Sequence, residues 1–299
     1  MTAATNVPER HGVAAPGYRL PASTVVGAVR LLVSDLGRSI DFYQRVLGLS
    51  VVERSSDAAA LAPAGHEPVL IRLETRAGVR GAGRRGALGL FHFAILLPDR
   101  ASLGRFVAHL AALGVPAGMS DHLVSEALYL SDPDGLGIEV YADRPRDRWT
   151  YRAGQLRMST EPLDVRDLVA AGGGQPWTGM PAGTAMGHLH LHVGDLDAAE
   201  AFFHRALGFD KVVWNYPGAL FLSAGGYHHH LGTNTWAPPV TPPADQAQLR
   251  SWDLVLPDAA AIAAAGDSLE RSGYVVDRSG DAVIAPDPWG TTFRLVTTR

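Results

Sequence analysis

The chain has 299 residues, of which 46% are hydrophobic and 19% charged, with no cysteine and a formal net charge of −4. A chain of this composition can bury a large core, and because no apolar run approaches the ~20 residues of a membrane span, we expect no membrane protein. The acidic balance gives no basic field for nucleic acid, the absence of cysteine excludes disulfides and thiolate chemistry, and residues 1–22 lack the apolar core of a secretion signal, so the cytoplasm is the expected location.

The predicted elements begin with an apolar strand over residues 28–33, which Asp35 closes. A helix is predicted over residues 36–47, where apolar side chains recur at helical spacing, and Gly48 is a typical residue at its end. Three further strands joined by tight turns complete the unit. The order of the unit is therefore βαβββ.

This unit recurs along the chain, as matching motifs show. Val33-Ser34-Asp35-Leu36 matches Val193-Gly194-Asp195-Leu196, Leu97-Pro98-Asp99 matches Leu256-Pro257-Asp258, and Asp132-Pro133 matches Asp287-Pro288. We therefore expect an α+β protein of four βαβββ modules. The predicted division is an N-terminal tail (1–24), module one (25–87), module two (88–142), a Gly- and Pro-rich connector (143–184) with one helix at 163–171, module three (185–236) and module four (250–299).

The first strands of modules two and three carry histidine at the same place. His92 stands seven residues before the Asp that closes its strand, and His188 stands seven residues before its own. The equivalent positions in modules one and four hold Ala28 and Ser251, which bind metals poorly. Because alternate residues of a strand share a face, both imidazoles are expected at the same depth.

A carboxylate completes this set. Glu139 lies among apolar neighbours in the last strand of module two, where module four has Arg294. Taken alone, Glu139 is read best as a strand-end carboxylate in solvent, but burying it in an apolar strand needs a counter-charge or a metal. Two histidines and one carboxylate form the facial triad of non-haem Fe(II) oxygenases, and the same set accepts Mn(II). We therefore predict a metal site at His92, Glu139 and His188.

Other histidines cluster nearby. His190 and His192 share the face of His188 and are assigned no direct contact with the metal. The run His228-His229-His230 is expected in the last strand of module three. A strand cannot aim three adjacent side chains at one ion, so one or two of them should face inward and the rest outward. This arrangement favours a catalytic histidine beside the metal.

Five segments carry a family resemblance that spans all four modules: residues 90–99, 125–135, 137–145, 187–193 and 225–232. In these segments the chain resembles the bacterial catechol-2,3-dioxygenases, which are extradiol enzymes of the vicinal oxygen chelate (glyoxalase/bleomycin resistance) superfamily. The resemblance implies two open β-barrels. Better-known extradiol enzymes place the metal in modules three and four. Here the ligands fall in modules two and three, so these two are expected to form the metal barrel, with modules one and four as its metal-free partner.

The resemblance also implies a reaction and its residues. An Fe(II) site, for which Mn(II) is the alternative metal, would cleave catechol or a substituted catechol with O2 beside the diol, giving a 2-hydroxymuconic semialdehyde. The family's acid–base histidine matches His229 best, with His230 as the alternative. His122 and Tyr129 match two hydrogen-bonding residues of the family if a two-residue shortening between them is accepted. Elsewhere, His204 lies on a predicted helix and is expected in solvent.

Two other functions of the superfamily stay open. Glyoxalase-like isomerases and transferases usually offer two carboxylates or a Gln, whereas the predicted site has one carboxylate. Metal-free proteins that bind aromatic compounds or antibiotics would have no reason to keep three ligands in register. The preferred catechol, the metal, the choice between His229 and His230 and the oligomeric state are left open by the sequence.

Overall fold

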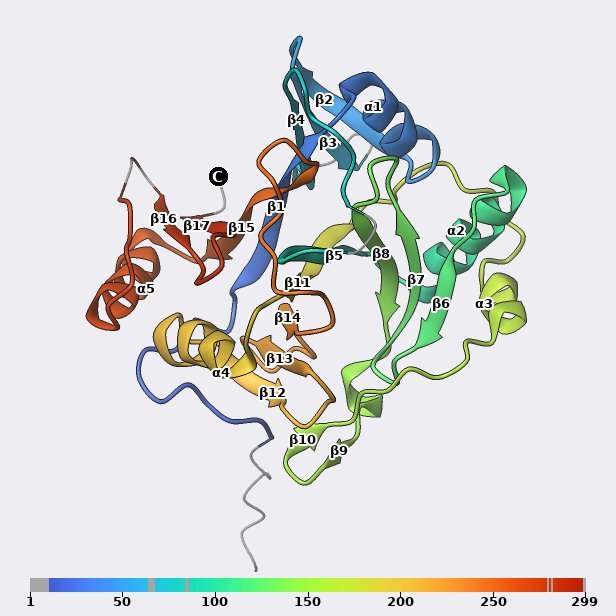
Figure 1. The fold of residues 1–299 in the computed structure, drawn as a ribbon. Coiled ribbons are helices and arrows are strands. Elements are labelled where there is room, and N and C mark those ends of the chain that lie inside the picture. The colour runs from blue at the N-terminus through green and yellow to red at the C-terminus, as the bar shows by residue number, and fades with distance from the viewer. Residues whose placement is uncertain (1–10, 64–67, 84–85, 279, 281, 298–299) are drawn as a thin grey trace, which may run out of the picture.

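The computed structural model describes residues 11–63, 68–83, 86–278, 280 and 282–297, so the first ten residues of the predicted tail lie outside the described part. Its strands form an eight-stranded sheet, a seven-stranded sheet and one small hairpin (Figure 1). Among the described residues, no helix is long and apolar enough to cross a membrane.

The eight-stranded sheet is built from modules two and three, as expected. It joins β5 and β11 antiparallel at its centre, with His92 opposite His190. Its order is β12-β13-β14-β11-β5-β8-β7-β6. The strands are β5 (Gly89–Leu96), β6 (Gly118–Asp121), β7 (Ser125–Ser131), β8 (Gly137–Asp143), β11 (Ala185–His192), β12 (Asp210–Val213), β13 (Ala219–Ser223) and β14 (Leu231–Asn234).

The seven-stranded sheet pairs modules one and four through antiparallel β1 and β15. Its strands are β1 (Val25–Val33), β2 (Leu49–Arg54), β3 (Ala58–Pro63), β4 (Ile71–Thr75), β15 (Gln248–Leu256), β16 (Val283–Pro286) and β17 (Thr292–Thr297). The expectation of three strands after the helix of module four was wrong, because its described residues form only two. Asp277 makes an isolated bridge to Ile284 instead, and residues 277–281 offer no apolar side chain for a longer strand.

Each module's helix begins directly after the Asp that closes its first strand. The four caps are Asp35, Asp99, Asp195 and Asp258, and the side chain of each accepts a hydrogen bond from the backbone N–H three residues later. Such a side chain satisfies a donor that the first helical turn leaves free. The helices are α1 (Leu36–Arg45), α2 (Arg100–Leu113), α4 (Leu196–Ala199) continuing into the π-helical η2 (Glu200–Ala206), and α5 (Ala259–Arg271).

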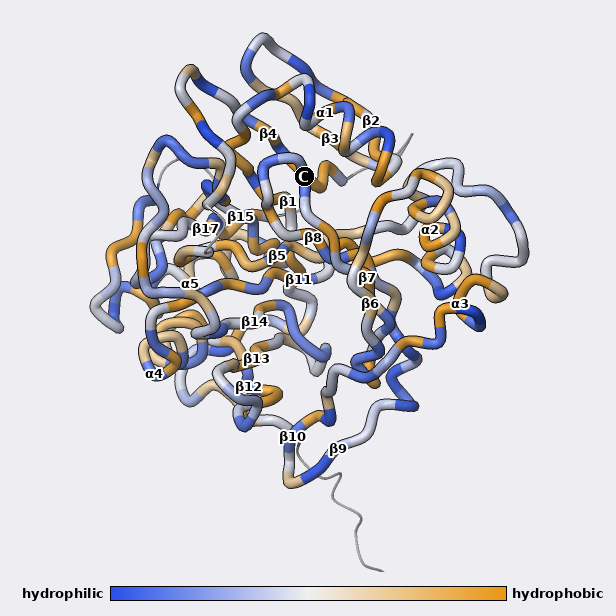
Figure 2. The backbone as a smooth tube through the Cα atoms, turned by 45° about the vertical axis from the view of Figure 1, so that its right-hand side comes forward, coloured by the Kyte–Doolittle hydropathy of each residue, from blue (hydrophilic) through white to orange (hydrophobic). Residues whose placement is uncertain are grey.

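The connector between modules two and three folds against the eight-stranded sheet. It contains η1 (Arg146–Arg148), the hairpin of β9 (Tyr151–Arg152) and β10 (Gln155–Leu156), and α3 (Val165–Ala171), which packs on α2. The helix predicted at 163–171 is thus present in a slightly shorter form. In Figure 2 the β9–β10 hairpin contains both hydrophilic and hydrophobic residues, and the central strands are hydrophobic with hydrophilic residues at intervals.

The central strands separate the main core from the interior of the curled sheet. In β5, Phe93 and Ile95 are fully buried in the main hydrophobic core. The residues on either side of Phe93, His92 and Ala94, face the opposite side of the sheet, since successive side chains of a strand alternate. The two faces of β5 therefore line two different interiors, the main hydrophobic core and the inside of the curled sheet.

The seven-stranded sheet carries an ion-pair cluster in place of metal ligands. Asp253 lies 2.7 Å from Arg30 and 3.5 Å from Arg294, the residue that replaces Glu139 in module four. Within the described residues, His92, Glu139 and His188 form the one group of potential ligands that is close enough to hold a metal. The two sheets thus have a similar arrangement of paired modules, but different residues occupy their equivalent positions.

Candidate metal centre

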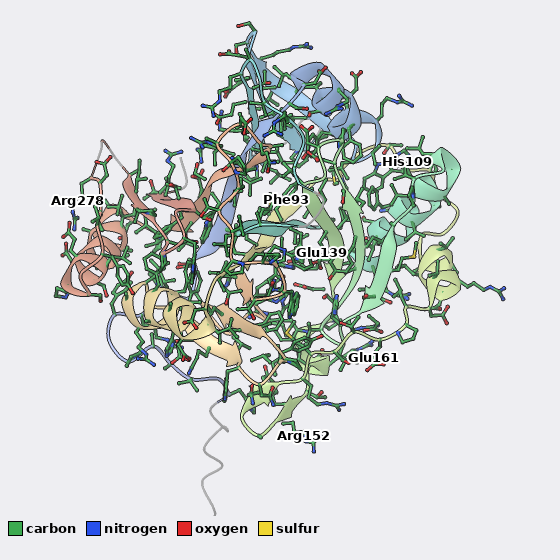
Figure 3. The ribbon with its side chains drawn as sticks, viewed as in Figure 1. Phe93, His109, Glu139, Arg152, Glu161 and Arg278 are labelled. Atoms are coloured by element: carbon green, nitrogen blue, oxygen red, sulfur yellow. The ribbon has the colours of Figure 1, made fainter. Side chains whose placement is uncertain are left out.

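Three adjacent strands bring the predicted ligands together. His92 comes from β5, Glu139 from β8 and His188 from β11, and all three side chains are buried. Their ligand atoms lie within 4.8 Å of one another. Nε2 of His92 is 3.0 Å, and Nε2 of His188 is 3.2 Å, from the same carboxylate oxygen, Oε2 of Glu139. Figure 3 shows Glu139 in the middle of the molecule, near the central strands.

The arrangement of these atoms fits a metal ion. Although Nε2 of His92 is close to Glu139, it has no hydrogen-bond partner among the described residues. A buried polar atom without a partner costs about 1–3 kcal/mol, which a bound cation would offset. Moreover, two ligands at right angles around an ion with bonds of about 2.1 Å would be about 3 Å apart. The donor set of two imidazoles and one carboxylate suits Fe(II) or Mn(II).

Burial and mutual contacts set the protonation states of these ligands. Burial acts to raise the pKa of Glu139, but His188 and His92 outweigh it and hold this pKa well below its ordinary value. Burial lowers the pKa of His188 to about 4, against the opposing effect of Glu139. At neutral pH the site therefore offers an ionised carboxylate and a neutral imidazole at His188, which are the forms that bind metals.

A cavity of about 240 Å³ opens beside the three ligands. Its walls combine hydroxyl and imidazole groups with an apolar side. The polar lining residues include Ser120, His122, Ser125, Tyr129, Ser159, Thr160, His190 and His229, and the apolar ones are Phe91, Met158, Phe221 and Trp236. Among the described residues, Glu139 is the single acidic side chain in this lining, and no lysine or arginine belongs to it.

His122 and Tyr129 form a hydrogen-bonded pair at the cavity wall. Nδ1 of His122 lies 2.7 Å from the carbonyl oxygen of Ser159 and must donate to it, so Nε2 is left to accept from the Tyr129 hydroxyl at 2.6 Å. Burial, followed by the charge of Glu139, raises the pKa of Tyr129 well above its ordinary value. The phenol therefore stays protonated at neutral pH.

The run His228-His229-His230 departs from its expected place. It precedes β14 instead of lying within it, and all three side chains are buried, so the expectation that some would face outward was wrong. A turn, unlike a strand, can direct three successive side chains into the interior. His229 lines the cavity, with its ring centre 4.1 Å from that of His188.

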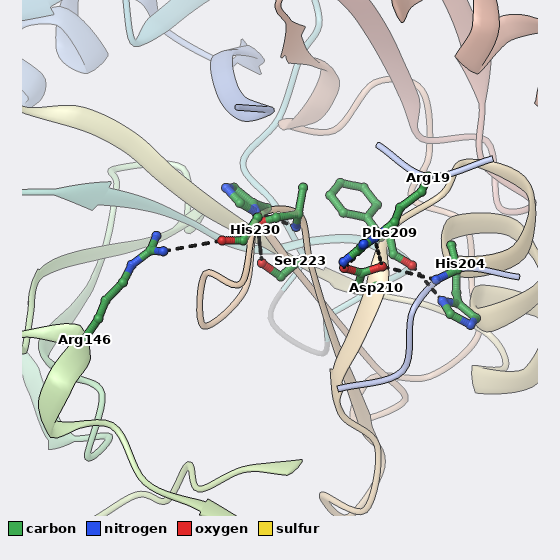
Figure 4. Close-up of polar contacts among 10 residues, drawn as sticks. Arg19, Arg146, His204, Phe209, Asp210, Ser223 and His230 are labelled. Carbon is green, nitrogen blue, oxygen red and sulfur yellow. Dashed lines mark hydrogen bonds and ion pairs between the residues drawn. The ribbon is translucent and has the colours of Figure 1, made fainter. Parts of the chain in front are cut away.

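His230 points away from the cavity. It does not belong to the lining residues, and its Nδ1 accepts a hydrogen bond of 3.2 Å from the backbone N–H of Ala224 (Figure 4). The same nitrogen lies 3.3 Å from the Ser223 hydroxyl. Of the two candidates for the acid–base role, only His229 therefore lies beside the metal ligands.

The remaining histidines have separate environments. His190 lines the cavity, and its Nε2 has no partner within the described part of the chain, whereas His192 pairs with Asn234 at 2.7 Å. The expectation that His204 is in solvent was wrong. It is buried because η2 packs against both α5 and β13, and its Nδ1 lies 2.6 Å from the carbonyl oxygen of Phe209 (Figure 4).

Several residues near the site have no distinctive sequence signal. Met158, Ser159 and Thr160 come from the connector, whose path could not be placed without the fold. Asp143, at the end of β8, contacts His228 at 2.9 Å. The sequence shows that Asp143 lies in a segment of family resemblance, but it does not show that His228 is its partner.

The fold and the sequence together place the chain in a known superfamily. Residues 25–140 and 185–295 match the family model described as Glyoxalase/Bleomycin resistance protein/Dioxygenase superfamily, and the chain belongs to this family. A protein of Bacillus subtilis (strain 168) named catechol-2,3-dioxygenase is 42% identical to it over 270 residues, which cover 89% of this chain and 94% of that protein.

Solved structures share the fold at low sequence identity. A Bacillus subtilis protein provisionally described as a dioxygenase aligns with a TM-score of 0.62 at 15% identity, covering 94% of this chain and 86% of the other. Glyoxalase I of Zea mays aligns with a TM-score of 0.56 at 17% identity, covering 92% of each chain. These likenesses concern the fold alone.

Proposed function

We propose that this protein cleaves catechol, or a substituted catechol, beside its two hydroxyl groups with O2, giving a 2-hydroxymuconic semialdehyde. The observation that carries the proposal is the convergence of His92, Glu139 and His188 from three adjacent strands at the floor of a cavity. The name of the Bacillus subtilis relative, at 42% identity, supports the same reaction.

His92, Glu139 and His188 would hold a single Fe(II) ion, with Mn(II) as the alternative. Such an ion, with three protein ligands, supplies open positions at which both catechol oxygens and O2 can be brought together. The protein's own contribution is to fix the three ligands by burial within a rigid sheet, so that they are positioned before the metal arrives.

His229 is the residue best placed to take a proton from the catechol. Burial, followed by the neighbouring His188 and His228, holds its pKa well below the ordinary value. It is therefore neutral at neutral pH and has a lone pair available as a general base. Once protonated, it can return the proton later in the reaction.

Tyr129 and His122 would orient the bound diol. The phenol stays protonated and offers its oxygen at the cavity wall, while the Ser159 carbonyl fixes the His122 ring behind it. The apolar side of the cavity, with Phe91, Phe221 and Trp236, fits an aromatic ring. A cavity of about 240 Å³ has room for catechol with small substituents.

A single carboxylate argues against a glyoxalase-like reaction. Isomerases of the superfamily usually use a second carboxylate or a Gln to move protons, and within the described part of the chain Glu139 is the one acidic residue that lines this cavity. A metal-free binding protein is likewise disfavoured. Burying the carboxylate of Glu139 is costly, and in such a protein no bound cation would offset that cost.

The test is turnover of catechol in air after anaerobic reconstitution with Fe(II) or, separately, Mn(II). We expect the yellow ring-opened semialdehyde with the wild-type protein. Glu139→Gln should lose the metal and at least about 1000-fold in rate, whereas Glu53→Gln, at an exposed position of β2 in the other sheet, should match the wild type. An iron-loaded wild type that forms no semialdehyde would overturn the proposal.

A further inference from the structure

A chain of three polar side chains leads from the end of β8 to the metal cavity. Oδ1 of Asp143 lies 2.9 Å from Nε2 of His228, and Nδ1 of His228 lies 2.7 Å from Nδ1 of His229. His228 is completely buried, and His229 lines the cavity. The chain therefore connects a partly exposed carboxylate to the proposed general base.

The donor and acceptor roles along this chain follow from the groups themselves. An ionised carboxylate can only accept, so Nε2 of His228 must carry a hydrogen and donate it to Asp143. A neutral His228 then has a lone pair on Nδ1, which can accept a hydrogen bond. Nδ1 of His229 must supply that hydrogen, which leaves Nε2 of His229 with the lone pair.

We propose that Asp143 and His228 are positioning residues that hold His229 as the tautomer with Nδ1 protonated and Nε2 free to accept a proton. Nε2 of His229 makes no hydrogen bond to any described residue, so it is available to a ligand in the cavity. The catalytic meaning of this tautomer rests on the proposed function. The tautomer itself does not.

The surroundings of Asp143 and His228 support this arrangement. The Tyr227 hydroxyl donates to the same oxygen of Asp143 at 3.2 Å and is itself 2.7 Å from the Tyr141 hydroxyl. The His228 ring contacts both Tyr227 and Trp149, with ring centres 4.0 and 5.5 Å away. The Asp143 carboxylate and the His228 ring are thus each held in place by several neighbours.

With Asp143 ionised, one other arrangement of protons has the same heavy-atom distances. A doubly protonated His228 would donate to both neighbours, and His229 would then be protonated on Nε2. That arrangement puts a cation in a completely buried position, which is costly, and leaves His229 unable to act as a base at Nε2. The same logic of a carboxylate that sets an imidazole tautomer operates in serine proteases.

In the reaction, one proton moves to His229, and the proton on Nε2 of His228 stays in place. Nε2 of His229 takes the proton of a catechol hydroxyl, and its Nδ1–H remains hydrogen-bonded to His228. The positive charge on the His229 ring is stabilised through His228 by the carboxylate of Asp143. Loss of this chain should therefore lower kcat more than it changes KM.

The first test reads the tautomer directly, in the metal-free protein with 15N-labelled histidine. Two-bond nitrogen–proton NMR correlations distinguish the Nδ1–H and Nε2–H forms, and His229→Gln assigns the signal. We expect His229 to be protonated on Nδ1 and His228 on Nε2. An Nε2–H signal from His229, or a doubly protonated His228, would overturn the inference whether or not the protein cleaves catechol.

A matched pair of variants gives the second test. His228→Leu keeps volume but removes both nitrogens, whereas the amide of His228→Gln can donate to Asp143 and accept from His229. For the iron-loaded enzyme we expect kcat to fall at least about 10-fold in the Leu variant, with KM within about 3-fold and unchanged iron content, and to recover largely in the Gln variant. Asp147→Asn, an exposed position nearby, is the control.

The outcomes separate the inference from the proposed function. Wild-type turnover together with an unaffected Leu variant would reject the positioning role and leave the function intact. Iron-loaded wild type without turnover would reject the function, while the NMR spectrum would still decide the tautomer. If the Leu variant does not fold, the wild-type spectrum alone remains decisive.

Discussion

Individual side chains in the site take their protonation states from burial or, for Glu139, from the neighbouring histidines. The three candidate ligands and His229 are buried and Tyr129 is partly buried, and for each of these residues with a shifted pKa the shift favours the form that the proposed chemistry needs. The sequence predicted that His92, Glu139 and His188 would lie close together, because repeated strands fix the depth of the two histidines, and the structure brings the three side chains together. The sequence left His229 and His230 open, because the direction of a side chain in a turn depends on the fold.

Tyr129→Phe tests the hydrogen-bonded pair at the cavity wall. The change removes the hydroxyl that lies 2.6 Å from Nε2 of His122 and leaves the ring in place. We expect kcat for catechol to fall about 10-fold with the iron content unchanged, since one oriented hydrogen-bonding group is lost and no metal ligand. Steady-state kinetics on iron-quantified enzyme checks this. A Tyr129→Phe variant with the kcat of the wild type would show that the Tyr129 hydroxyl has no part in the mechanism.

His229→Gln and His230→Gln compared side by side test the assignment of the general base. Because only His229 lines the cavity, we expect a fall in kcat of at least about 100-fold in its variant and a smaller loss in the other. Both variants should retain iron. A larger loss of kcat from His230→Gln would reverse the assignment.

At the scale of elements, the four capping aspartates show why the helices could be predicted from the sequence. Each one marks both the end of a strand and the start of a helix, so its local chemistry is independent of the rest of the fold. The end of module four and the start of β14 were missed, because strand formation there depends on which neighbour is available to pair.

Asp258→Ala tests the contribution of a cap to stability. The Asp258 side chain accepts from the Ala261 N–H at 2.8 Å at the start of α5. We expect the free energy of unfolding to fall by about 1 kcal/mol, measured by urea denaturation. Asp258→Ser, which can cap the helix equally well, should stay within about 0.5 kcal/mol of the wild type.

Asp287→Asn tests a buried carboxylate in the turn before β17. Burial raises the pKa of Asp287 to about 6, from an ordinary value of 3.8, although backbone N–H groups of Thr291 and Trp289 oppose this. The folded state therefore binds the proton more tightly than the unfolded chain, and this residue's contribution to stability is lost as the pH rises from about 4 through about 6.

Asn at this position keeps a carbonyl acceptor and does not titrate. The stability of Asp287→Asn relative to the wild type should therefore increase between pH 4 and pH 7, by about 1–3 kcal/mol. Chemical denaturation at several pH values measures the difference. A difference that does not change with pH would contradict the raised pKa.

For the molecule as a whole, the pairing of modules decides where chemistry can occur. His92 belongs to module two and His188 to module three, so they lie in different halves of the chain. Their side chains can meet only if β5 pairs with β11. That requirement made the pairing predictable. The cavity walls were not predictable, since Met158, Ser159 and Thr160 reach the site on a connector without repeats.

The most direct measurement of the central claim is anaerobic Fe(II) binding, with iron quantified per chain. A single centre closed by modules two and three predicts one Fe(II) per chain, with affinity lost at least about 100-fold in both His92→Ala and His188→Ala and kept in Ser251→Ala, the equivalent position in the other sheet. Binding of a second equivalent, or wild-type affinity in either histidine variant, would contradict the claim.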